Sequence, residues 1–155
     1  MISIQEQLDL LAQTRKNLRA VMDACTTEQL YTIPEQFNNH ILWNAAHVVA
    51  TMHILIYASS GTPSQIDPDM VDNFKKGTFP SQEKSEDSIE RVKASLIDSL
   101  DELKKDYENS AFGTYSERMT SYGVKLASVE EAICFNNLHE SMHLGQIKML
   151  RTLVA

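Results

Sequence analysis

The sequence contains few of the residues that define small disulfide-bonded or cysteine-based zinc proteins. Its 155 residues include only two cysteines, Cys25 and Cys134, which lie far apart in the chain. Two isolated cysteines exclude a disulfide framework and a cysteine-based zinc site, and each is typical of a small buried side chain. We therefore expect a protein of the reducing cytoplasm.

Positive charge is also scarce. The chain has 14 Lys and Arg against 21 Asp and Glu, which gives a formal net charge of −7. A protein that binds DNA or RNA must neutralise phosphates with Lys and Arg, and an anionic lipid surface makes the same demand. The charge balance therefore predicts neither nucleic acid nor membrane among the partners.

No long hydrophobic run and no secretory leader are evident. The most apolar stretch, Ala45 to Ser59, is shorter than a bilayer-spanning helix and contains two histidines. The N-terminal segment lacks a basic region followed by an apolar run, so we expect no signal peptide. The length of 155 residues predicts a single domain, 1–155, with a core of its own.

Hydrophobic residues recur at three- and four-residue steps in four segments, which predicts four helices. The predicted helices span about residues 3–25, 39–59, 85–107 and 128–153. Ser128 and Glu131 have the spacing of a capping box at the start of the last one. No strand alternation and no internal repeat accompany them, so the expected fold class is all-α.

The spacing of these helices predicts a four-helix bundle. About 25 residues, with several glycines and prolines, separate the second and third predicted helices. Such a connection is too long for a tight turn and can cross the length of the bundle. The second and third helices would then run parallel, in an up-down-down-up order.

Polar residues occupy the middle of the buried stripe on the last predicted helix. At steps of four and three residues the stripe runs through Ala132, Asn136, His139, His143, Gln146, Leu150 and Leu153. Buried polar side chains need partners. His47 lies in the middle of an apolar stripe on the second predicted helix. If the two helices face each other, His47, His139 and His143 form a set of three imidazoles able to hold a divalent metal ion. A buried hydrogen-bond network is the alternative.

The residues from His139 to His143 also spell H-E-x-x-H, which is typical of zinc metalloproteases. A protease needs a third ligand downstream, and no acidic residue or histidine follows His143. Glu140 to His143 matches the E-x-x-H motif of di-iron bundles, but the second copy that such a centre requires is absent. Both classes are therefore disfavoured.

Further residues are assigned roles around this centre. Glu140 is the candidate catalytic residue, as a proton acceptor or by orienting a ligating imidazole, with a solvated side chain as the alternative. Asn44 and Gln146 are candidates for lining the pocket or supporting the ligands. Tyr122 is a candidate cover for its mouth. His40 either lines the mouth or simply marks a helix start, and His53 is not expected to be a ligand.

Taken together, these residues resemble the DinB/YfiT-like superfamily of small four-helix proteins. The resemblance is carried by the segments 39–47 (NHILWNAAH), 122–124 (YGV) and 139–147 (HESMHLGQI), and it extends over the whole chain in length and helix order. It implies an up-down-down-up bundle with a divalent metal ion held by His47, His139 and His143. Zinc and nickel are the first expectations, with iron, manganese or cobalt as alternatives. Such proteins are commonly homodimers, and relatives include metal-dependent transferases and isomerases that use low-molecular-weight thiols.

The expected function is a metal-dependent thiol S-transferase, or a related hydrolase, acting on a small electrophile. The alternative is a non-catalytic metal-binding or stress-response protein. The second predicted helix has no Asp, Glu, Lys or Arg between Ile41 and Tyr57, which predicts a second buried face. A partner subunit or the long loop would cover that face. We expect a homodimer that uses Val48, Val49, Met52, Leu55 and Ile56.

Overall fold

The structure, a computed structural model, describes residues 2–155 and confirms the all-α prediction. Helices dominate, and the one sheet among the described residues has two short strands. The elements are α1 (Ile4–Asp23), α2 (Thr27–Tyr31), α3 (Ile41–Met52), the π-helix η1 (His53–Ala58), α4 (Pro68–Phe74), α5 (Glu86–Glu108), β1 (Arg118–Met119), β2 (Lys125–Leu126) and α6 (Val129–Leu153). The π-helix η1 continues α3 without a break.

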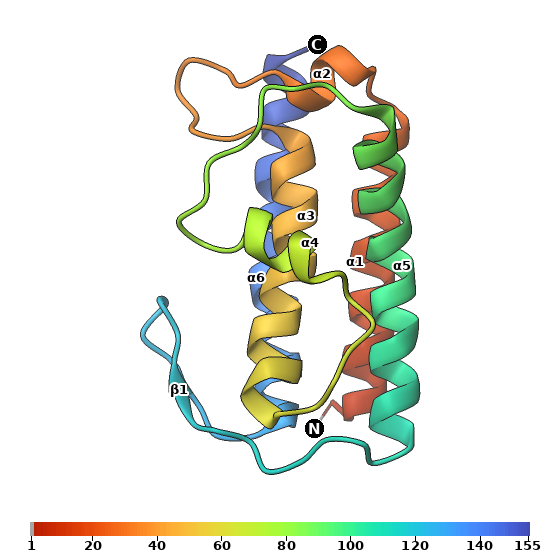
Figure 1. The fold of residues 1–155 in the computed structure, drawn as a ribbon, viewed down its shortest axis with the longest axis vertical. Coiled ribbons are helices and arrows are strands. Elements are labelled where there is room, and N and C mark those ends of the chain that lie inside the picture. The colour runs from red at the N-terminus through yellow and green to blue at the C-terminus, as the bar shows by residue number, and fades with distance from the viewer. Residues whose placement is uncertain (1) are drawn as a thin grey trace.

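Four long helical segments lie side by side: α1, α3 with η1, α5 and α6 (Figure 1). Both α1 and α3 pack against α5 and α6. In Figure 1 the chain ascends through α1, descends through α3, descends again through α5 and ascends through α6. The connection from η1 to α5 therefore returns along the length of the molecule, and α4 within it packs on α3.

The helix ends are set by side-chain caps. Ser3, Ser85 and Ser128 each accept a hydrogen bond from a backbone amide three residues later. These bonds satisfy amides that have no partner inside the helix. The predicted capping box at α6 is half formed, because the Glu131 carboxylate accepts from the Ala127 amide at 2.7 Å and not from that of Ser128.

The core consists of two hydrophobic clusters with a layer of buried polar side chains between them. On α1, Leu18 belongs to one cluster and Leu11 to the other, with Arg15 between them. On α6, Glu140 lies in the same way between Ile133 and Ile147. The polar layer therefore crosses the molecule at mid-height, next to the predicted histidine cluster.

The predicted dimer interface is wrong, because its side chains are buried inside the chain. Val48, Val49, Met52, Leu55 and Ile56 are each at most 5% exposed. Val48 and Val49 share a hydrophobic cluster with Met70 of α4. The long connection thus provides the cover that the apolar second helix requires.

Four further elements, two short helices and two short strands, lie outside the sequence prediction. The helices α2 and α4 have five and seven residues. The strands pair antiparallel, with Arg118 opposite Leu126 and Met119 opposite Lys125. Two-residue strands are too short to show the alternation by which a strand is recognised in a sequence.

One helical window, Ile41–Ala58, is long and apolar enough to cross a membrane by length and composition alone, and 78% of it is buried in the molecule. A core helix of a folded domain passes the same test.

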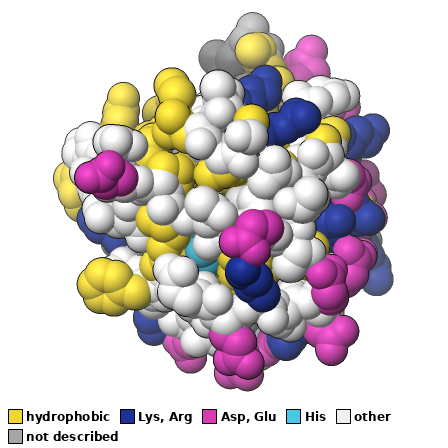
Figure 2. Space-filling model, turned by 90° about the horizontal axis from the view of Figure 1, so that it is seen from above, with side chains coloured by type: hydrophobic (Ala, Val, Ile, Leu, Met, Phe, Trp, Pro, Cys, Tyr) yellow, Lys and Arg dark blue, Asp and Glu magenta, His cyan; other side chains and the backbone are white. Residues whose placement is uncertain are grey.

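The charged side chains are unevenly distributed over the surface. Seen from above, acidic groups concentrate on the side of α1 and α5, and exposed hydrophobic groups are more frequent on the opposite side (Figure 2).

Candidate metal centre

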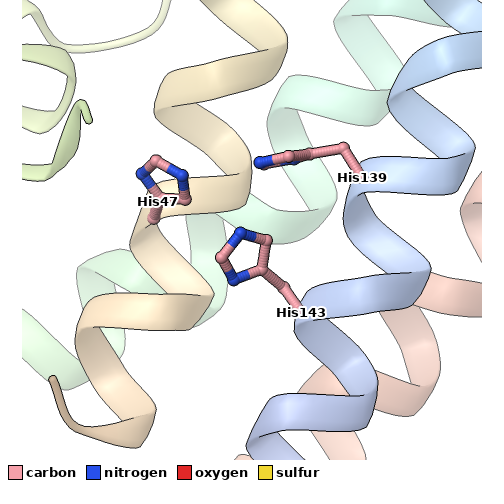
Figure 3. A group of neighbouring side chains, drawn as sticks. All are labelled: His47, His139 and His143. Carbon is pink, nitrogen blue, oxygen red and sulfur yellow. The ribbon is translucent and has the colours of Figure 1, made fainter. Parts of the chain in front are cut away.

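Two helices bring the three predicted histidines together. His47 lies on α3, and His139 and His143 lie one turn apart on α6. Each ring offers one nitrogen atom to this group, and these three nitrogen atoms all lie within 4.8 Å of one another. Figure 3 shows the three rings facing one another across the gap between the helices. The group can therefore hold one metal ion.

Two of the imidazoles are oriented from behind by hydrogen bonds. His47 Nδ1 donates to the Phe74 carbonyl at 2.6 Å, and His143 Nδ1 donates to Asn44 Oδ1 at 2.8 Å. A metal-ligating histidine characteristically donates its second ring nitrogen in this way, which fixes the tautomer and leaves Nε2 as the ligand. Asn44 thus orients one of the candidate ligands, which is one of its two predicted roles. The Phe74 carbonyl was not foreseen, because a backbone group has no sequence signal.

His139 has an unsatisfied buried nitrogen. Its Nδ1 is buried and has no hydrogen-bond partner among the described residues. An orphaned buried polar atom carries a free-energy cost and is unusual in a native protein. Unlike Nδ1 of His47 and His143, this nitrogen has no protein group that fixes the tautomer of its ring among the described residues.

The environment keeps these histidines neutral. Burial lowers the pKa of His143 to about 3, with the neighbouring His139 and His47 contributing. Burial also lowers the pKa of His139 to about 4, with His47 and Arg15 contributing, and it lowers the pKa of His47. Only the neutral ring offers a lone pair to a metal, so the ligand-competent form prevails at neutral pH.

Glu140 is fully buried and lies in the polar layer, so the solvated alternative is wrong. Its carboxylate accepts from Arg15 Nε at 2.5 Å and from Arg15 Nη2 at 2.7 Å. The Asn136 amide donates to the same carboxylate at 2.8 Å. Both oxygens are therefore engaged. These contacts favour a structural role, and the catalytic role of Glu140 stays a prediction.

Arg15 is the partner that sequence reasoning missed. Its guanidinium also donates to the Leu96 carbonyl at 3.0 Å and to Ser99 Oγ at 3.3 Å, and the side chain is fully buried. A buried charge is tolerated only when it is paired and hydrogen-bonded, as here. The available signal was a cation on the apolar stripe of α1, between Leu11 and Leu18.

A pocket of about 760 Å³ opens beside the cluster. His47 and His139 line it, whereas His143 lies outside the lining. Tyr122, the predicted cover for the mouth, is 68% exposed and lines the pocket. Three neutral imidazoles next to an accessible cavity are suited to zinc, nickel or iron, with positions left for a small ligand.

The other candidates lie outside the cluster. His40 caps α3, because its side chain accepts from the Trp43 amide at 3.0 Å. His53 contacts Ser64 Oγ at 2.9 Å and is not part of the group, as expected. Gln146 is half-buried and does not line the pocket. Asn44 is the supporting candidate that hydrogen-bonds to a histidine of the cluster.

Comparison with known proteins identifies one family. The family model of the DinB superfamily matches residues 10–147, a range that contains all three histidines. No curated protein matches the sequence.

Proposed function

The chain belongs to the DinB superfamily, and from this membership and the three-histidine cluster we propose that it binds a divalent metal ion through His47, His139 and His143. The observation that carries the proposal is the convergence of three neutral imidazoles, two of them oriented by Phe74 and Asn44. Zinc and nickel are the preferred ions, with iron, manganese or cobalt as alternatives.

We further propose that the protein is a thiol S-transferase that acts on a small electrophile. A divalent ion in such a site supplies a Lewis acid, which makes a bound thiol easier to deprotonate. The chain's own contribution is to hold three uncharged ligands that leave the charge of the ion undiminished. The pocket, whose wall is partly apolar, holds the electrophile beside His47 and His139.

One observation favours a second candidate, a non-catalytic metal-binding protein. Among the described residues that line the pocket there is no Asp or Glu. The one carboxylate next to the histidines in sequence, that of Glu140, is bound by Arg15 and Asn136. A base for proton transfer would have to come from the substrate or from water.

A conjugation assay separates the two candidates. The metal-loaded protein is mixed with a low-molecular-weight thiol and a model electrophile, and thioether formation is compared with that of the metal-stripped protein. We expect turnover that depends on the metal and disappears in His143→Ala. A metal-loaded protein that turns over none of the common cellular thiols would favour the non-catalytic candidate.

We also propose that the protein is a cytoplasmic homodimer. Its interface would lie on a different face of the molecule from the one that the sequence predicted. Met149 and Leu153 of α6 are about half exposed, at 56% and 50%, and lie outside the lining of the pocket. They follow one another at helical spacing and form an apolar strip that a second copy can cover. Sedimentation equilibrium at micromolar concentration tests this, and a monomer there would contradict it.

A further inference from the structure

The pocket beside the histidines has a charge opposite to that of the whole protein. Lys75, Lys76 and Arg118 line it, and no acidic side chain does so among the described residues. The chain as a whole has a net charge of −7. A cationic lining in an acidic protein indicates a site for an anion, because such a cavity concentrates ligands of opposite charge.

Arg118 is fixed in place and has donors to spare. Its Nη1 donates to the Ile54 carbonyl at 2.9 Å and to Ser59 Oγ at 3.0 Å. Ile54 lies in η1 and Ser59 directly follows it, so these bonds hold the guanidinium against η1. Its Nε is buried and has no partner among the described residues. The same described residues provide no carboxylate within ion-pair distance of Arg118. A guanidinium held by neutral groups alone is a preformed binding group for a carboxylate.

Lys76 supplies a second free cation from another part of the chain. It follows α4, directly before Gly77, whose φ of +92° turns the chain there. Its side chain is exposed and forms no ion pair with the described residues. Lys75, by contrast, is paired with Asp72 at 2.7 Å. Arg118 and Lys76 are therefore the two uncompensated charges of the pocket.

The rest of the wall is apolar. Leu55 of η1 and three side chains of α6, Phe135, Leu138 and Met142, line the pocket together with His139. Apolar side chains favour a hydrocarbon body, and a few placed polar groups set its orientation. The pocket thus combines an anion-binding group, an apolar wall and the candidate metal ligands.

We propose that this pocket binds a small organic carboxylate with an apolar body. Arg118 and Lys76 hold the carboxylate, the body lies against Phe135, Leu138 and Met142, and the remaining end faces the histidines. This inference rests on the proposed function, because it names the class of substrate that the proposed site would bind. The binding residues, however, are distinct from the metal ligands.

The test compares 4-phenylbutyrate with its neutral amide by calorimetry, on metal-loaded and on metal-stripped protein. We expect the acid to bind about tenfold more tightly than the amide, as a charge-assisted hydrogen bond provides. Lys76→Gln and Arg118→Gln should each reduce this preference several-fold, and Arg118→Lys should retain part of it. The matched control is Lys16→Gln, at an exposed position of α1 outside the pocket.

Several results would overturn the proposal: no binding at millimolar concentration, equal affinity for acid and amide, or inorganic phosphate binding as tightly as the acid. A preference for the acid that survives both substitutions but disappears on metal removal would place the carboxylate on the ion and also overturn it. Lys76→Gln alters an exposed side chain, so the test holds even if Arg118→Gln misfolds. Metal content is measured separately, so a protein without metal would contradict the proposed function alone.

Discussion

His143 is held on one side by a single amide, and this contact is open to a direct test. We expect Asn44→Ala to lower metal affinity about 10- to 100-fold, the usual effect of removing the group that orients a metal-ligating imidazole. The measurement is a competition titration of the metal-stripped protein against a chelator. Asn17→Ala is the matched control, since Asn17 lies on the exposed face of α1. Unchanged affinity in a folded Asn44→Ala protein would contradict the assigned role.

The role of Glu140 can be settled by separating stability from chemistry. Arg15 and Glu140 are both fully buried, so Glu140→Gln leaves a buried guanidinium without its counter-charge. We expect a loss of about 3–5 kcal/mol in the free energy of unfolding, measured in urea, and a similar loss for Arg15→Met. Glu90→Gln, at a surface ion pair, should change stability by less than about 1 kcal/mol.

The double variant Arg15→Met with Glu140→Gln should be more stable than the sum of the two single losses implies, because neither charge is then left alone. Glu140→Gln that abolishes turnover while stability stays unchanged would restore the catalytic interpretation of this residue.

At the scale of single residues, the sequence predicted the three candidate ligands and missed their surroundings. His47, His139 and His143 could be found because each interrupts an apolar stripe. The partner of Glu140 could not be assigned, because Arg15 lies 125 positions away on another helix. Such pairing depends on how α1 and α6 are packed, which periodicity does not specify.

Among the elements, the start of α3 is sensitive to pH. The neutral His40 ring accepts from the Trp43 amide at 3.0 Å, and its other nitrogen donates to the Ser81 carbonyl at 3.1 Å. Burial lowers the pKa of His40 below the 6.5 of an unfolded chain. As the pH falls below 6.5, the unfolded state takes up the proton first. The stabilisation by this cap is therefore complete above that pH and is lost progressively below it.

His40→Asn keeps a capping acceptor and removes the titrating ring. We expect the free energy of unfolding of the metal-stripped variant to fall less steeply between pH 7.5 and pH 5 than that of the parent, with a cap contribution of about 1 kcal/mol. Urea titrations at several pH values measure both slopes. Identical slopes in parent and variant would show that His40 does not titrate with folding.

The long helices were predictable and the short elements were not. Periodicity placed α1, α5 and α6 to within a few residues, because each buries one face along many turns. The five residues of α2 and seven of α4 are too few for a period, although Thr26 and the pair Asp67-Pro68 mark their starts as caps do. The π-helix η1 depends on the register of backbone hydrogen bonds, which the side-chain pattern does not encode.

At the scale of the whole molecule, the histidine cluster joins α3 to α6, so a bound ion should stabilise the fold. Zinc or nickel at 100 times its dissociation constant should add about 2.7 kcal/mol, or roughly 5–10 °C in melting temperature for a domain of this size. Thermal unfolding with and without metal measures the shift. His143→Ala should show little of it. An equal shift in both proteins would indicate binding elsewhere on the chain.

The whole-molecule prediction that failed is also instructive. The apolar second helix predicts a second buried face, covered by a partner subunit or by the long loop, because a bundle helix normally has one polar face; the expected homodimer interface took the first of these. In the structure α4 packs on α3 and supplies the missing cover. The sequence is compatible with either kind of cover, because a long connection can cross the bundle without packing on its helices or can pack against one of them.

Metal content tests the proposed centre most directly. The protein, purified without a metal-binding tag, is compared with His143→Ala by elemental analysis, before and after incubation with zinc, nickel or manganese. We predict close to one divalent ion per chain in the parent and its loss in the variant. A parent that holds no metal even after incubation would show that the three histidines form only a buried polar network, and the proposed function would be wrong.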